Sequence, residues 1–166
     1  MTRLLISIDK LSEYAAKAFA WLIVPMVGGL VYEVVSRYVF GSPTRWSYDL
    51  TYMLYGALFI MASAYALRLD RHVRIDVFYR KFSPRWKGIT DATLYLVLFF
   101  PVVIVLLVKG VDYAAHSWAI REVSSAGAWR PPLYPLKTLF PIAMLLLLLQ
   151  GLAQFVRSLQ VAKGGQ

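Results

Sequence analysis

The sequence contains no cysteine among its 166 residues. This absence excludes a disulfide framework, a thiolate nucleophile and any metal site built on cysteine sulfur. It also leaves the redox character of the compartment open, because the chain has no thiol whose state would report on it. Function must therefore rest on other side chains.

Charged residues are scarce, at 16% of the chain, whereas hydrophobic residues make up 59%. This composition is too apolar for an ordinary soluble domain and is typical of an integral membrane protein. The formal net charge is +9, but the cations flank apolar runs instead of forming a solvated basic domain. We therefore expect anionic phospholipids as the charged partner and no nucleic acid.

Between residues 50 and 67 there is no charged side chain at all. A run of this length is typical of a transmembrane helix. An interior without titratable groups argues against an ion-coupling or catalytic site within the hydrocarbon. The search for function moves to the two membrane surfaces.

Four apolar stretches are long enough to cross a bilayer core of about 30 Å. The sequence predicts an all-α integral membrane protein, a single domain with transmembrane helices at about residues 15–39, 47–69, 84–115 and 137–158. Asp9 and Glu13 interrupt the N-terminal region, so the first span is expected to be uncleaved. Ser83 and Pro84 read as an N-cap and first helical residue, which predicts a third helix longer than the bilayer is thick.

The connection between the second and third spans is the most basic. With four spans it lies on the same side as both termini, and that side carries twice as many lysines and arginines as the other. The positive-inside rule then predicts cytoplasmic N- and C-termini.

Within this connection, apolar residues recur at helical spacing while cations occupy the other faces. This pattern predicts a short amphipathic helix in the membrane interface at about residues 73–82, between the second and third transmembrane helices. Its candidate membrane-interface residues are His72, Arg74, Asp76, Phe78, Tyr79 and Phe82.

Catalytic and cofactor motifs are missing from the sequence. The two histidines, His72 and His116, lie outside the predicted hydrocarbon region, and they have no cysteine with which to form a zinc site. The chain has no phosphate-binding glycine loop and no nucleophile elbow. We therefore expect no enzyme activity, no cofactor and no metal.

Glu33 is the carboxylate nearest the membrane midplane. An i,i+4 ion pair with Arg37 that reaches the interface accounts for it better than a role as a proton-coupling acid. Two alternatives stay open: a small homodimeric proton-coupled antiporter that uses Glu33, and a membrane-anchor subunit of another complex.

Aromatic residues gather at the span ends, where an interfacial belt is expected. The belt does not explain two outer segments, residues 45–49 and 122–135, which combine turn residues, prolines, aromatics and charges. We interpret them as surfaces shaped for a protein partner. The candidate partner-interface residues are Arg37, Tyr38, Phe40, Arg45, Trp46, Asp49, Glu122 and Trp129.

These residues also carry a family resemblance. Arg37-Tyr38-Val39-Phe40, Trp46 and Asp49, followed by His72-x-Arg74-x-Asp76, resemble the small membrane (Q-type) subunit of tripartite ATP-independent periplasmic (TRAP) transporters. The second half is similar too, through Glu122-x-Ser124, Trp129, Pro131-Pro132, Pro135-x-Lys137, Pro141 and Gln150-Gly151. The chain departs from the family at Tyr48, where members often have the first of two adjacent acids.

The resemblance implies the small permease subunit of a secondary importer in the bacterial inner membrane, driven by a cation gradient. The implied partners are the large TRAP membrane subunit and a periplasmic solute-binding protein. The implied role is to scaffold the large subunit and help seat the solute-binding protein. With no solute or ion site expected here, the sequence does not indicate the transported solute.

Overall fold

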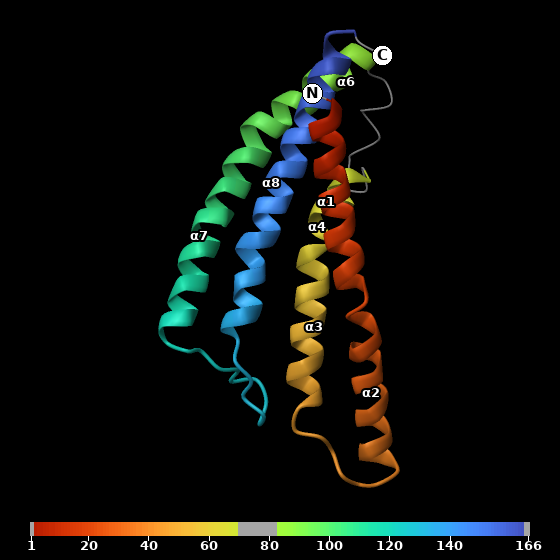
Figure 1. Ribbon diagram of the computed structural model, residues 1–166, viewed down its shortest axis with the longest axis vertical. Coiled ribbons are helices and arrows are strands. Elements are labelled where there is room, and N and C mark those ends of the chain that lie inside the picture. Colours follow the sequence, from red (N-terminus) through yellow and green to blue (C-terminus); the bar gives the residue numbers. More distant parts are fainter. Residues whose placement is uncertain (1, 70–82, 165–166) are drawn as a thin grey trace.

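Figure 1 shows the computed structural model, which describes residues 2–69 and 83–164. These residues form helices α1 (Thr2–Ala20), α2 (Ile23–Tyr38), α3 (Ser47–Met61), α4 (Ser63–Arg68), α6 (Pro84–Leu94), the π-helix η1 (Tyr95–Phe99), α7 (Phe100–Ala119) and α8 (Tyr134–Ala162). They combine into four rods, each long and apolar enough to cross a membrane. The predicted all-α fold with four transmembrane helices is confirmed.

The first rod is broken between α1 and α2, at Trp21 and Leu22. Pro25 explains the position, because proline has no backbone N–H and its ring clashes with the carbonyl of the residue four positions earlier, which is Trp21. The neighbouring N–H groups re-form the chain of hydrogen bonds, with Val24 N donating to the Trp21 carbonyl at 3.1 Å. The α-helical pattern is therefore interrupted for two residues, while the rod continues from α1 into α2.

The third rod runs unbroken through α6, η1 and α7 over 36 residues. At 1.5 Å per residue it is about 54 Å long, well beyond the hydrocarbon thickness. It starts at Pro84, with Ser83 in extended conformation at the N-cap position. The π-helix ends two residues before Pro101, a common place for a local change in helical pitch.

Helix α8 is the centre of the bundle. Half of its most apolar window is buried, against 6% for the α1–α2 rod and 11% for the α6–α7 rod. Both α6 and α7 pack along α8, and α4 contacts it from the other side, whereas α2 packs chiefly on α3. The core cluster joins α3 and α4 to α7 and α8 through Met61, Ala64, Leu67, Val103, Ala143, Met144, Leu146 and Leu147.

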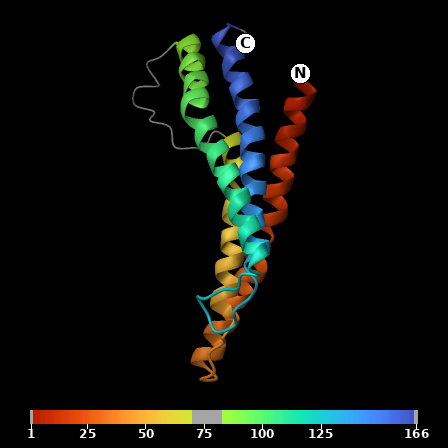
Figure 2. The same ribbon diagram turned by 90° about the vertical axis from the view of Figure 1, so that its left-hand side faces the viewer.

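The two ends of the bundle differ. Helix α1 starts and α8 finishes at one end, here called the terminal end (Figures 1 and 2). The α2–α3 and α7–α8 connections lie at the opposite end, here called the loop end. The amphipathic helix predicted at residues 73–82, with all six of its candidate interface residues, lies outside the described residues.

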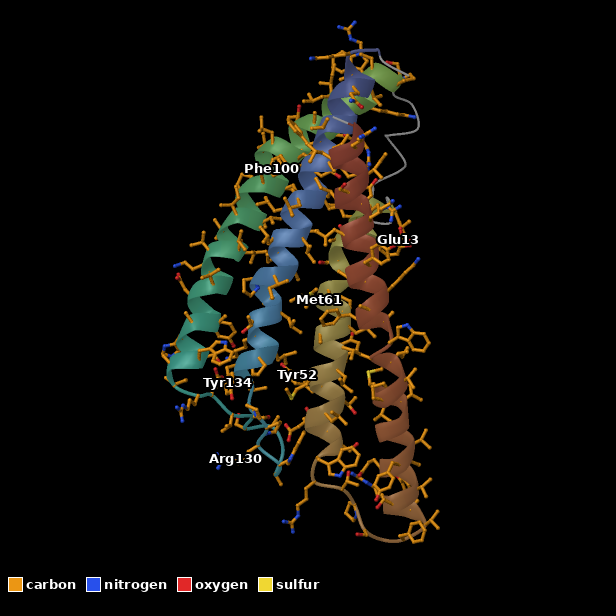
Figure 3. All side chains as sticks on the ribbon, viewed as in Figure 1. Glu13, Tyr52, Met61, Phe100, Arg130 and Tyr134 are labelled. Carbon is orange, nitrogen blue, oxygen red and sulfur yellow. The ribbon has the colours of Figure 1, made fainter. Side chains whose placement is uncertain are left out.

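A polar network ties α1 to the bundle near the terminal end. Gln150 of α8 is fully buried; its amide donates to Asp9 at 2.9 Å and accepts from the Ser12 hydroxyl at 2.8 Å. Arg157 of α8 pairs with the other Asp9 oxygen at 2.5 Å. From α4, Arg68 pairs with Glu13 at 2.6 Å, and Figure 3 labels Glu13 on α1. This network pairs the charged residues in the first part of α1, so the helix can begin at residue 2. The sequence predicts the first span only from about residue 15.

Candidate partner interface

The α2–α3 connection is fastened to the end of α2 by Glu33. One carboxylate oxygen accepts a hydrogen bond from Arg37 Nε at 2.8 Å, and Arg37 Nη2 donates to the same oxygen. The other oxygen accepts from the Thr44 backbone N–H at 2.8 Å and from the Thr44 hydroxyl. Both oxygens are thus occupied, so Glu33 closes the connection as well as forming the expected pair with Arg37.

Trp46 lies at the other end of this connection and packs back onto α2. Its ring stacks on Tyr32, with centroids 5.7 Å apart and planes at 27°. A Cβ added at Gly29 would be in ordinary contact with the Trp46 ring, at 3.5 Å, so the indole packs directly on this part of α2. The start of α3 is therefore held against the loop-end half of α2.

The α7–α8 connection folds into a short bridged loop. Ser124 N donates to the Pro131 carbonyl at 2.8 Å and Leu133 N to the Glu122 carbonyl at 2.9 Å, with an isolated antiparallel bridge between Val123 and Pro132. These bonds satisfy backbone groups that a free loop would leave to water.

Asp49 joins this loop to α3. Its side chain is 1% exposed, and one carboxylate oxygen accepts a 2.6 Å hydrogen bond from the Ser124 hydroxyl. Gly127 covers the carboxylate so closely that any side chain there would collide with it. The second oxygen is buried and has no hydrogen-bond partner among the described residues. We call the contact among Asp49, Ser124 and Gly127 the loop latch, because it makes one surface of two connections distant in sequence.

Glu122 and Lys137 pair at the base of the α7–α8 loop, 2.5 Å apart. The Lys137 ammonium also lies 3.9 Å from the centroid of the Tyr113 ring of α7. The hydrogen bond from Lys137 is the main reason why the pKa of Glu122 lies below its usual value. The loop is therefore anchored to both α7 and α8 by a charge pair that holds at neutral pH.

A groove of about 770 Å³ separates α3 from the α7–α8 pair in the loop-end half. Its floor and walls are mostly apolar, with Lys109, Glu122 and Lys137 among its polar lining residues. Tyr52 and Tyr55 of α3 line this groove and also a smaller hollow of about 340 Å³ beside α2. Figure 3 labels Tyr52 on α3, on the side that faces α8.

Helix α3 carries a stripe of aromatic side chains, of which Tyr52 and Tyr55 line the groove. Tyr48, Tyr52, Tyr55 and Phe59 recur at helical spacing, and each is more than half exposed. The hydroxyls of Tyr52 and Tyr55 have no hydrogen-bond partner in the part of the chain that the structure describes. Gly56 lies on the same wall of the groove, with nothing within 4 Å of the place where a Cβ would stand.

The predicted partner-interface residues all lie at the loop end but fall into two groups. Tyr38, Phe40, Arg45 and Trp129 are exposed. Trp46, Asp49 and Glu122 bond or pack within the chain, as Arg37 does through Glu33. The structure brings Asp49 of the first connection against the second and leaves the exposed group free to meet another molecule.

Several residues that hold the loops and helices together were not identified from the sequence. Ser124 and Gly127 complete the loop latch, and Asp9 and Gln150 form the centre of the α1 network. Two glutamines four residues apart in a mostly apolar helix, Gln150 and Gln154, were a readable signal of a buried polar face. No comparable signal marks the pairing of Asp49 with Ser124.

These features define an integral membrane protein of four helices whose two loop-end connections form one surface. The chain belongs to the family described as tripartite ATP-independent periplasmic transporters, DctQ component, which matches residues 26–161. It is therefore a small membrane subunit of a TRAP transporter, a multi-pass protein of the inner membrane. The family implies association with a large membrane subunit and a solute-binding protein. No match was found among curated proteins.

Proposed function

We propose that this chain is the fixed scaffold of the transporter, with no solute or ion site of its own. It holds the large membrane subunit along the groove between α3 and α7–α8, so that the mobile part of that subunit can move against a wider base. Its loop end faces the periplasm and helps to seat the solute-binding protein, while the terminal end faces the cytoplasm.

The observation that carries this proposal is the tyrosine-lined groove. Tyr55 lies eight residues into α3, about 12 Å along the helix axis and thus within the hydrocarbon if α3 starts at the interface. Lipid tails offer no hydrogen bond to a phenol hydroxyl, whereas a helix of a second protein can. Unpartnered hydroxyls at this depth support protein, not lipid, as the occupant of the groove.

Gly56 supports the same assignment. Glycine in a helix interior costs about 1 kcal/mol relative to alanine, and none of the described residues packs into the space it leaves. Small residues in membrane helices allow the backbone of a neighbouring helix to approach closely. A helix of the large subunit lying in the groove would use that space.

The state of Glu33 supports scaffolding over proton-coupled antiport. Arg37 and Thr44 engage both carboxylate oxygens, whereas a coupling acid must release and rebind a proton during each cycle. Replacing Glu33 by glutamine should therefore weaken assembly or stability in step with transport. An assembled, stable complex that loses all exchange would instead favour the antiporter.

Two experiments test the proposal. One asks whether transport requires this chain, and the other asks where this chain contacts the large subunit. Transport in vesicles should fall to background when the large subunit and solute-binding protein are present without it. In the complete transporter, Gly56→Leu should reduce co-purification with the large subunit about tenfold or more, since it fills the groove.

Gly28→Leu is the matched control. Gly28 is also an open glycine in a membrane helix, but it lines neither the groove nor the hollow beside α2. It should leave co-purification unchanged. Normal uptake by the large subunit without this chain would refute scaffolding, and equal effects of the two leucines would refute the groove as the contact.

A further inference from the structure

Three exposed arginines at the loop end, Arg45, Arg121 and Arg130, form no salt bridge with any described residue. The acids at this end do not compensate them. Glu33 and Glu122 are committed to Arg37 and Lys137, Asp112 of α7 lies 3.9 Å from Lys109, and Asp49 is buried in the loop latch. The loop end thus presents positive charge with no partner in the described chain.

Two of these arginines occupy strained backbone positions. Among the described residues, Arg121 (φ 47°) and Arg130 (φ 53°) are the only ones other than glycine with positive φ. Arg121 directly follows the last turn of α7, where Glu122 N donates to the Ser117 carbonyl at 3.0 Å. Glycine is usual at such a helix end, because a Cβ is strained in the left-handed region. Keeping arginine there gives up backbone stability, which indicates a use for the side chain.

The bridged loop holds the backbone next to both arginines in place. Arg121 comes immediately before the segment 122–124 and Arg130 immediately before its pairing partner, segment 131–133. The loop latch holds that pair of segments against the start of α3, one turn from Arg45. Figure 3 labels Arg130 on this loop, at the loop end of the bundle. Charges held in place lose less conformational freedom on binding than charges on a free loop.

We propose that Arg45, Arg121 and Arg130 are the docking site for an acidic patch on the solute-binding protein. The inference rests on the proposed function, which places the loop end in the periplasm, and adds the residues and the chemistry of docking. Guanidinium groups pair with carboxylates through paired N–H donors and are enriched at protein interfaces. Outer connections of membrane proteins are usually poor in cations, so three uncompensated arginines there point to an anionic protein partner.

The test uses the complex of this chain with the large subunit in bilayer discs of zwitterionic lipid, with the cognate solute-binding protein purified separately. The double variant Arg121→Gly, Arg130→Gly should bind that protein about tenfold more weakly, mainly through slower association. The dependence of affinity on salt should flatten. The Tm of the complex that contains the double variant should equal or exceed that of the unchanged complex, because glycine relieves the backbone strain.

Two further variants serve as controls. Arg121→Lys with Arg130→Lys keeps the charge and should retain most of the salt dependence. Arg85→Ala removes an exposed arginine from the opposite end of the bundle and should leave receptor binding unchanged.

The proposal is overturned if the glycine variant binds with unchanged affinity and salt dependence. It is also overturned if the loss appears only in discs of anionic lipid, which would assign the arginines to headgroup phosphates. If the scaffold proposal fails, the result is different, because the unaltered chain would then not hold the large subunit at all.

Discussion

At the residue scale, the glycines show how closely the helices approach one another. Gly88, Gly110, Gly127 and Gly151 each lie where an added Cβ would collide with a neighbouring helix or with the Asp49 carboxylate. Gly56 and Gly28 lie in open space in the single chain. Glycine therefore marks tight packing inside the subunit at four places, and a partner contact is proposed at one of the two helical glycines that meet open space.

Replacing Gly88 by alanine should destabilise the protein by about 1–3 kcal/mol. A Cβ at this position would lie 2.5 Å from the Ala162 backbone nitrogen and 2.7 Å from the Ser158 carbonyl oxygen. Both atoms belong to the α8 backbone, so no side chain can rotate away and α6 must move from α8. Thermal unfolding in detergent measures the effect.

Gly56→Ala provides the comparison, since it meets open space and improves helix propensity by up to about 1 kcal/mol. It should leave the Tm of the isolated chain unchanged or raise it. Equal losses of stability in the two variants would show that α6 and α8 are not packed as described.

The pair of Glu122 and Lys137 predicts a dependence of stability on pH. Because the folded-state pKa of Glu122 is lowered, mainly by the Lys137 hydrogen bond, the ionised carboxylate stabilises the fold. This contribution is fully present above the unfolded-state pKa of 4.5 and is lost as pH falls through the lowered pKa. Glu122→Gln should lower the Tm at neutral pH, and its difference from the unchanged chain should shrink with acidification.

The measurement is a series of unfolding curves for both proteins from neutral pH to about pH 2. Asp112→Asn is a suitable control, because Asp112 lies 3.9 Å from Lys109 and both side chains are largely exposed. A gap between the Gln variant and the unchanged chain that stays constant across the series would contradict the assignment.

At the element scale, α1 is the helix whose attachment depends most on polar contacts. It is held to α4 and α8 by Asp9, Ser12 and Glu13, with Gln150 buried at the centre. A buried network of this kind stabilises only while all its members have partners. The attachment of α1 is therefore sensitive to single substitutions in α8.

Gln150→Leu should destabilise the protein by about 1–3 kcal/mol, because Ser12 and Asp9 each lose a buried hydrogen-bond partner. The loss should be local to α1. Since the chain has no cysteine, a cysteine introduced at Ala16, which is buried, can report on the detachment of α1 through its rate of thiol labelling. A conservative Gln150→Glu control is unsuitable, because it would place a second carboxylate beside Asp9.

A better control is Leu152→Gln, on an exposed position of the same helix, which should leave labelling at residue 16 slow. If Gln150→Leu also leaves labelling slow and the Tm unchanged, the α1 network does not hold the helix in place.

At the scale of the whole molecule, packing is concentrated on α8 and thins out toward the loop end, where α2 has chiefly α3 as its neighbour. Such a bundle presents wide apolar sides to its surroundings and one latched surface at the loop end. This shape fits a subunit that braces a larger neighbour, as proposed, with the groove beside α3 as the line of contact.

Much of this architecture follows from the sequence alone. The apolar runs determine the four helices, because backbone groups in hydrocarbon must bond within their own segment, and Ser83-Pro84 marks the start of α6. The order of the motifs from Arg37 to Gln150 indicates the family. Pro25 gives the interruption between α1 and α2 its physical cause, because a proline cannot donate the backbone hydrogen bond that a regular helix needs.

Tertiary structure alone decided which polar residues meet. Asp49 and Ser124 are 75 positions apart and Asp9 and Gln150 are 141 apart, and neither pairing has a local pattern, since helix periodicity specifies faces but not which face meets which. The same limit explains why Asp49, expected at a partner surface, lies buried in a latch, while the strain at Arg121 and Arg130 is visible only in the folded backbone. Each helix is determined by its own segment, because its backbone hydrogen bonds are local. Contacts between helices are determined only when the helices pack against one another.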